Sequence, residues 1–213
     1  MAYLLYLDTS AQATQVLCIH NQQVLAERSI AESRDHGQHI HQLIDAILSE
    51  TKLQLSQFDA FVVMNGPGSY TGLRIALSVA KGFCYALQKP LYLLHKLHVT
   101  AKACLALNPQ HAFSVIARAR AGEYFHAQYN RLGQVEAAAS IKTSEALNAM
   151  NSPFYTFQTL AECAWESVQT VPLNTSTLAQ CSFDAFLHEK PADLMYAEPF
   201  YLKNVYINKI NKL

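Results

Sequence analysis

Three short apolar runs separated by polar turns open the chain and predict a β-meander: Tyr3–Leu7, Gln15–His20 and Val24–Ile30. The stretch Gln38–Glu50 then carries apolar residues three and four positions apart, which is the spacing of one face of an α-helix. Phe58–Met64 is a continuous apolar run and predicts a buried strand. The first part of the chain therefore predicts a sheet with a helix packed against it.

The rest of the chain continues to alternate between strands and helices. A glycine-rich turn leads into a predicted helix Leu73–Gln88, followed by a strand Leu91–Leu94 and a helix Leu97–Leu107. The later predicted elements are a strand, a hairpin, a helix, two strands and a helix: Phe113–Ala117, Glu123–Tyr129 with Gln134–Ala138, Ser144–Met150, Phe154–Phe157, Ser167–Val171 and Ser176–Leu187. This order indicates an α/β protein with a mixed sheet in each of two lobes, residues 1–102 and residues 103–213.

The composition narrows the choice of partners. Hydrophobic residues make up 51% of the 213 residues and charged residues only 15%, so much of the surface must be neutral or apolar. Such a surface is either a contact with another protein or simply an exterior rich in Gln and Asn. The 16 basic residues balance the 16 acidic ones, and a protein that binds nucleic acid directly normally carries a basic excess. We therefore expect any contact with RNA to run through another protein.

Cysteine usage and hydropathy indicate the compartment. The five cysteines form no CxxC pair, and Asp8 interrupts the first apolar run too early for a signal peptide. The sequence contains no apolar stretch of the roughly 18 residues that a membrane span needs. These features predict a cytoplasmic protein with reduced thiols and no membrane contact.

Two segments could bind an anion. Asp8, Thr9 and Ser10 directly follow a buried strand, where a carboxylate and two hydroxyls could face a phosphate and its metal, or could simply form a polar turn. The second segment connects a strand to a helix and contains Gly66, Pro67, Gly68, Ser69, Tyr70, Thr71 and Gly72. Amides at a helix start favour an anion, yet glycines also allow tight packing of the turn. The segment is neither a Walker loop nor GxGxxG.

The helix after this turn is apolar on nearly every side and has only two charged residues, Arg74 and Lys81. Such a helix is buried on two sides, so its second side should meet the other lobe or another chain. Its small residues Ala76, Ala80 and Gly82 would let a second helix approach closely.

The histidine pairs do not predict a metal site. His39 and His41 would point to different sides of a helix, and no acidic residue lies near His95 and His98 in the sequence. We expect these histidines to be exposed or to cap helices. GxSxG and HExxH are both absent from the sequence, so no catalytic residue is predicted either.

Four stretches in this order resemble the TsaB (YeaZ) family along nearly the whole chain: Leu5–Ser10, Gly66–Ile75, Ala119–Glu123 and Ala197–Leu202. The resemblance implies the actin-like ATPase (ASKHA) fold. It also implies a non-catalytic scaffold that binds the paralogue TsaD, and with it TsaE, for formation of N6-threonylcarbamoyladenosine at position 37 of tRNAs that read ANN codons. Such a protein would contact tRNA only through the complex and form a homodimer when alone. It would bind no cofactor tightly, although ATP or ADP could lie at the partner interface.

Departures from the catalytic paralogue agree with that role. The resemblance implies that the paralogue holds a metal through HxxxH, whereas here only two residues separate His95 from His98. After residue 113 the only glycines are Gly122 and Gly133, so a second glycine-rich phosphate loop cannot form. Arg118 stands where the family usually has Asp. The alternative is an independent actin-fold ATPase or a peptidase.

The resemblance also implies that two first-lobe helices contact the partner. The predicted interface residues are Ile40, Leu43, Ile44, Ile75, Ala76, Val79, Ala80 and Phe83.

Overall fold

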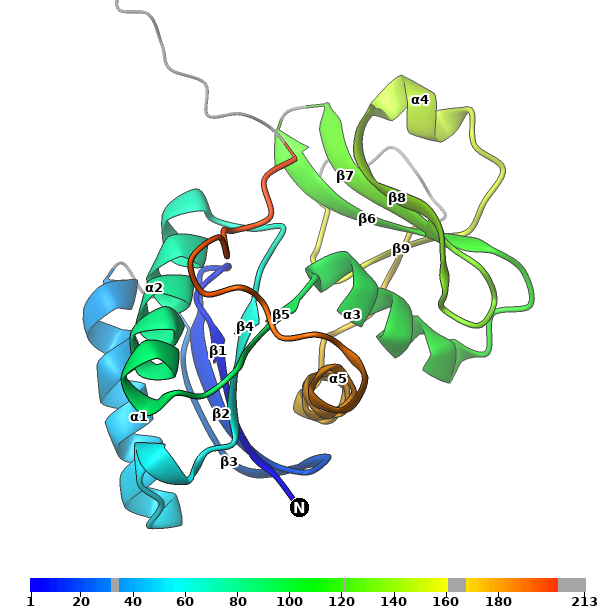
Figure 1. The fold of residues 1–213 in the computed structure, drawn as a ribbon. Coiled ribbons are helices and arrows are strands. Elements are labelled where there is room, and N and C mark those ends of the chain that lie inside the picture. The colour runs from blue at the N-terminus through cyan, green and yellow to red at the C-terminus, as the bar shows by residue number, and fades with distance from the viewer. Residues whose placement is uncertain (32–34, 121, 161–167, 203–213) are drawn as a thin grey trace, which may run out of the picture.

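The computed structural model describes residues 1–31, 35–120, 122–160 and 168–202 of the chain. Its two five-stranded sheets form two lobes (Figure 1). The first sheet has the order β3-β2-β1-β4-β5, in which β4 and β5 run parallel to β1 and the first three strands form the predicted antiparallel meander. Its strands are β1 Tyr3–Asp8, β2 Thr14–His20, β3 Gln23–Ile30, β4 Ala60–Met64 and β5 Leu91–Leu94.

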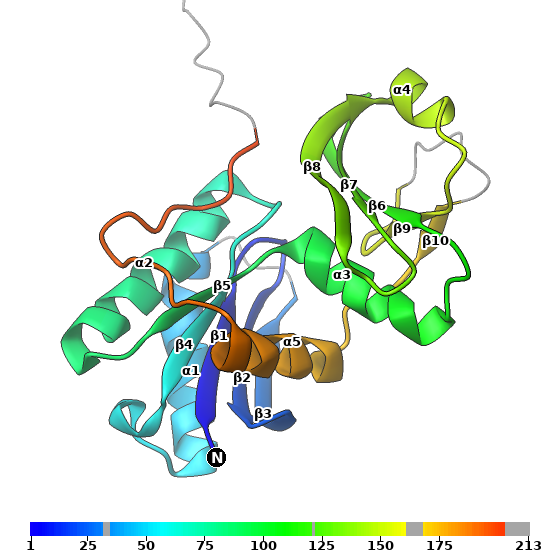
Figure 2. The ribbon, with the colours of Figure 1, turned by 45° about the vertical axis from the view of Figure 1, so that its right-hand side comes forward.

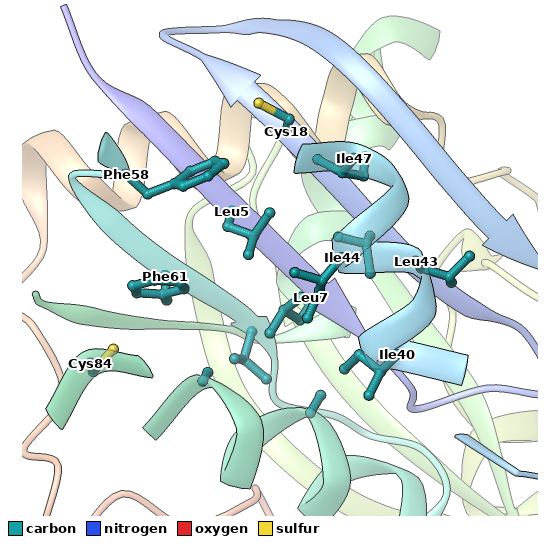
Figure 3. Close-up of a cluster of buried hydrophobic side chains, with 14 of the residues drawn as sticks. Leu5, Leu7, Cys18, Ile40, Leu43, Ile44, Ile47, Phe58, Phe61 and Cys84 are labelled. Carbon is teal, nitrogen blue, oxygen red and sulfur yellow. The ribbon is translucent and has the colours of Figure 1, made fainter. Parts of the chain in front are cut away.

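Helices α1 (His36–Thr51) and α2 (Tyr70–Leu87) cover one face of this sheet. Asp35 caps α1 and Ser69 caps α2, because each side chain accepts a hydrogen bond from an amide in the first turn. Figure 3 shows Ile44 and Ile47 of α1 on the side of the helix that faces Leu5 and Leu7 of β1. This cluster is the main core of the first lobe.

The opposite face of the first sheet is covered by α5 (Thr175–His188), as Figure 2 shows. Helix α3 (Lys96–Cys104) lies between the lobes, because Val99 packs in the first-lobe core while Leu97 and Ala101 pack against the second sheet. The short 3-10 helices are η1 (Leu55–Gln57) and η2 (Leu105–Leu107).

The second sheet has the order β10-β9-β6-β7-β8 and is also mixed. Its strands and the helix beside it are β6 Phe113–Arg120, β7 Glu123–Tyr129, β8 Val135–Thr143, α4 Ser144–Asn148, β9 Phe154–Thr156 and β10 Val168–Thr170. Thr143 caps α4, because its side chain accepts a hydrogen bond from the Ala146 amide. The predicted start of the last strand, Ser167, lies outside the described residues.

The predicted architecture of two lobes with mixed sheets is confirmed, but the chain does not divide at residue 102 as predicted. Helix α5 packs on the first sheet although the sequence assigned it to the second lobe. The segment 190–202 also returns to the first lobe, where the Ala192 amide donates to the Leu91 carbonyl at 2.8 Å. The apolar faces of β1 and β4 need a cover on both sides of the sheet, and a late helix supplies the second one.

The returning segment 190–202, here called the strap, runs along one flank of α2 (Figure 1). Lys81 Nζ donates to the Ala197 carbonyl at 3.1 Å, and Arg74 Nε donates to the Tyr201 hydroxyl at 2.9 Å. The Arg74 guanidinium also lies 4.4 Å from the centre of the Tyr70 ring, which stacks on Tyr201. Part of the second side of α2 is therefore covered by this chain itself.

The glycine-rich turn packs directly on the end of β1. A Cβ atom at Gly72 would lie 1.9 Å from the Thr9 carbonyl oxygen, and one at Gly68 would lie 2.3 Å from the Ser10 carbonyl oxygen. Thr9 Oγ1 donates to the Gly72 carbonyl at 2.5 Å and accepts from the Ala76 amide at 3.2 Å. Only residues without a side chain permit this backbone-to-backbone approach.

Replacement of Gly72 by Ala should destabilise the protein by about 3 kcal/mol or more, because α2 must move away from β1 to make room. The free energy of unfolding in urea would measure this loss. Gly82→Ala is the matched control, since a Cβ there meets nothing within 4 Å in the same helix. The control should gain about 0.5–1 kcal/mol from helix propensity. Equal stability of the two variants would contradict the packing argument.

Burial of histidines makes the stability depend on pH. His126 is 1% exposed, its Nε2 lies 3.0 Å from Ser114 Oγ, and burial together with the charge of Lys142 lowers its pKa to about 4. Burial, with a smaller contribution from His98, likewise lowers the pKa of His95 to about 4. An unfolded chain binds these protons near pH 6.5, so between pH 6.5 and 4 it takes up protons that the folded state rejects.

We therefore expect the free energy of unfolding to fall as the pH drops from 7 to 5, by about 2 kcal/mol for each of these histidines. Denaturant titrations at several pH values would measure the slope. His126→Gln keeps a hydrogen-bonding group but cannot take up the proton, so its profile should be flatter. A variant profile as steep as that of the wild type would show that another group is responsible.

Candidate functional site

A cleft of about 910 Å³ opens between the two lobes. The first lobe contributes Ser10, the turn 67–69 and Lys96, whereas the second lobe contributes Arg118 and Phe157. The ends of β1, β4 and β5 meet here because these strands are parallel neighbours. Ligands of open α/β sheets bind outside such strand ends, so this cleft is the candidate ligand site.

Asp8 ends β1 beside Ser10 and Lys96, which line the cleft, and its side chain is 13% exposed. One carboxylate oxygen, Oδ1, accepts hydrogen bonds from the Ser10 amide at 2.7 Å and from Ser10 Oγ at 2.5 Å. The other, Oδ2, accepts from the Tyr6 hydroxyl at 3.3 Å. This contact and burial raise the pKa of Tyr6 well above its usual value, with burial as the larger cause. The predicted triplet Asp8, Thr9 and Ser10 thus forms a polar turn in which both Asp8 carboxylate oxygens already accept hydrogen bonds.

Lys96 completes this arrangement and was missed by the sequence analysis. The residue is 4% exposed, its Nζ lies 3.5 Å from Asp8 Oδ2, and Nζ also donates a hydrogen bond to Ser10 Oγ. The Lys96 amide donates to the Gly66 carbonyl at 2.6 Å, which fixes the start of α3 against the glycine-rich turn. A lysine is rarely this buried unless its charge is paired. In the sequence its one unusual feature is a position two residues after the end of a buried strand.

The structure brings the predicted anion-binding residues together, but some of their donors are already used. The Ser69 amide donates to the Ser10 carbonyl at 2.7 Å, and the Gly72 amide donates to Ser69 Oγ at 3.2 Å. Gly66, with φ of +106°, and Gly68 shape the turn. Close packing therefore accounts for these glycines, and anion binding at this turn stays a prediction.

The predicted interface residues divide into two groups by burial. Five of them pack within this chain's own core, with exposed fractions of 0–7%: Ile40, Leu43, Ile44, Ala76 and Ala80. The other three, Ile75, Val79 and Phe83, are half-buried on α2 and pack against the same core. A partner on this surface could reach only the second group without opening the core.

Apart from Tyr70 and Arg74, which contact Tyr201 of the strap, the exposed residues of α2 carry no charge: Thr71, Ser78, Gly82, Tyr85 and Ala86. Tyr85 is 76% exposed, and nothing lies within 4 Å of a Cβ built on Gly82. We call these five residues the α2 outer face. A neutral helix face that is flat except for one aromatic side chain suits the approach of another helix.

The histidine pair of α3 is half-buried, not exposed as predicted. His95 occupies the N-cap position of α3 and its ring lies 4.4 Å from that of Phe200 in the strap, but its side chain makes no capping hydrogen bond. Burial, and then the charge of Lys102, lower the pKa of His98. Among the described residues no three His, Cys, Asp or Glu side chains come together as metal ligands. None of the described helices is both long and apolar enough to cross a bilayer.

Comparison with known proteins identifies the family. The family model described as TsaD, tRNA N6-adenosine threonylcarbamoyltransferase, matches residues 23–191. The TsaB proteins of Haemophilus influenzae and Escherichia coli are 31% and 28% identical over 128 residues, which are 60% of this chain and 54% and 55% of theirs. The aligned region thus spans about half the length of these curated relatives.

A solved structure has the same fold. The crystal structure of a Pseudomonas aeruginosa protein, described as similar to peptidase YEAZ, superposes with a TM-score of 0.76 at 23% identity and covers 95% of this chain and 100% of that one. The two proteins therefore share one two-lobed fold. The chain belongs to the family of TsaD, tRNA N6-adenosine threonylcarbamoyltransferase, within which it resembles the members named TsaB or YeaZ.

Proposed function

We propose that this protein is a non-catalytic scaffold subunit that docks TsaD through the α2 outer face and so supports formation of N6-threonylcarbamoyladenosine in tRNA. Membership of the TsaD family and the TsaB names of its relatives favour this pathway. The observation that carries the docking proposal is the exposed, uncharged outer face of α2.

This surface is held rigidly on three sides. Its helix packs on the first sheet, α1 lies along one flank and the strap covers the other. A rigid surface loses little conformational entropy on binding, so a modest area can give a stable complex. The same face would form the homodimer when TsaD is absent, and TsaE and tRNA would join through TsaD.

The inter-lobe cleft supports the non-catalytic part of the proposal. Asp8 is the acidic residue best placed for ATP hydrolysis, yet its oxygens are engaged by Ser10, Tyr6 and Lys96. The alternative, an independent ATPase or peptidase, gains no support from this arrangement. A weakly bound ATP or ADP at the partner interface remains compatible with it.

Gly82→Glu should abolish binding to TsaD while the protein stays folded. Glutamate fits at this open helical position, but it would place a charge with no partner in a helix–helix contact. Size-exclusion chromatography with light scattering, on this protein alone and mixed with TsaD from the same organism, would measure both complex and homodimer. We expect at least about a hundredfold weaker association, since burying an unpaired charge costs several kcal/mol.

Gln180→Glu is the matched control, because it adds the same charge at an exposed position of α5, on the opposite face of the first sheet. It should bind TsaD as the wild type does. A Gly82→Glu protein that still forms the complex at full yield would refute docking through this face. A wild-type protein that neither associates with TsaD nor supports the tRNA modification would refute the scaffold role itself.

A further inference from the structure

The inter-lobe cleft contains the buried ammonium group of Lys96 beside the Asp8 carboxylate. A phosphate bound through a metal ion would need this carboxylate to be free to hold the metal. Asp8, Thr9 and Ser10 offer the oxygen ligands that hard cations such as Mg²⁺ prefer. Lys96 Nζ already occupies this position, 3.5 Å from Asp8 Oδ2 and in contact with Ser10 Oγ. The Lys96 side chain is only 5% exposed, so it cannot leave for solvent without opening the cleft wall.

The hydrogen bonds around Lys96 form a consistent set of donors and acceptors. Ser10 Oγ gives its one proton to Asp8 Oδ1 and uses a lone pair to accept from Lys96 Nζ. The ring of Phe157, from the second lobe, lies with its centre 5.4 Å from Nζ and adds a cation–π contact. The ammonium is thus held by groups from both lobes.

A divalent cation does not fit beside this group. A cation bound to Asp8 would lie within a few ångströms of Nζ, and two positive charges that close repel strongly in a poorly solvated site. It would also have to displace the Ser10 amide and hydroxyl from Oδ1 or the Tyr6 hydroxyl from Oδ2. The residues present therefore disagree with the metal that an actin-like ATPase fold implies at this place.

We propose that Lys96 acts as a built-in cation of the Asp8 site and excludes divalent metal ions from the inter-lobe cleft. The ammonium neutralises the charge of the Asp8 carboxylate as a metal ion would. Unlike a metal ion, it has no coordination position for a phosphate or a water. Metal binding in the cleft can be measured on this protein alone, so the result is independent of the proposed scaffold role.

The test is Mn²⁺ binding to the full chain, measured by electron paramagnetic resonance of free Mn²⁺ and by the shift of the melting temperature with added Mg²⁺. Lys96→Met removes the charge and keeps an apolar stem, so the affinity for Mn²⁺ should rise at least about tenfold. The gain should vanish in the double variant Asp8→Asn/Lys96→Met. Lys102→Met, which removes an exposed charge from the same helix, should leave Mn²⁺ binding unchanged.

If Lys96→Met does not fold, Lys96→Ser replaces it, because serine leaves room for water beside the carboxylate. Wild-type protein that binds Mn²⁺ and loses it on Asp8→Asn would overturn the proposal. So would folded Lys96 variants that bind no more Mn²⁺ than the wild type.

Discussion

The close approach of the glycine-rich turn to the end of β1 is the contact on which the rest of the first lobe depends. The backbones of Gly68 and Gly72 touch the carbonyl groups of Ser10 and Thr9, so α2 cannot move relative to the central strand. Thr9 Oγ1 bridges the two by hydrogen bonds to α2 at both Gly72 and Ala76. These bonds are buried and nearly free of competition from water, which makes the junction rigid.

This junction sets the position of both surfaces on which function is proposed. The Lys96 amide donates a hydrogen bond to the Gly66 carbonyl, so the start of α3 is held against the same turn. This contact places the Lys96 ammonium beside Asp8. The direction of α2 follows from its packed first turn, and that direction decides which residues form the outer face. The glycine-rich turn thus fixes the positions of both the inter-lobe cleft and the α2 outer face.

The secondary structure was predictable from the sequence because apolar periodicity and the glycine turn are local signals. The meander, α1, α2 and β7 were predicted near their observed bounds, whereas β8 continues to Thr143, beyond its predicted end at Ala138. The surface against which each apolar stripe is buried was not predictable. The apolar stripe of Ile40, Leu43 and Ile44 looks the same whether it meets its own sheet or another protein, and only the fold shows that it meets the sheet.

Lys96 and the return of α5 escaped prediction for a different reason. Residues 8 and 96 are neighbours only because β1, β4 and β5 are parallel and adjacent, which is a property of topology. A lysine at a helix start gives no sign in one sequence that it is buried. In the same way, the amphipathic pattern of α5 fits a cover for either sheet, so chain order wrongly assigned it to the second lobe.

The strap explains how the outer face of α2 can stay exposed without weakening the helix. The Arg74 guanidinium lies over the Tyr70 ring, which stacks on Tyr201, and Lys81 binds the strap carbonyl at Ala197, so both charged side chains of α2 are turned to this flank. The outer face is left neutral because its neighbours on the helix have partners within the chain. A docking partner would therefore meet one exposed charge at the edge of this face, that of Arg74, whose side chain already contacts Tyr70 and Tyr201.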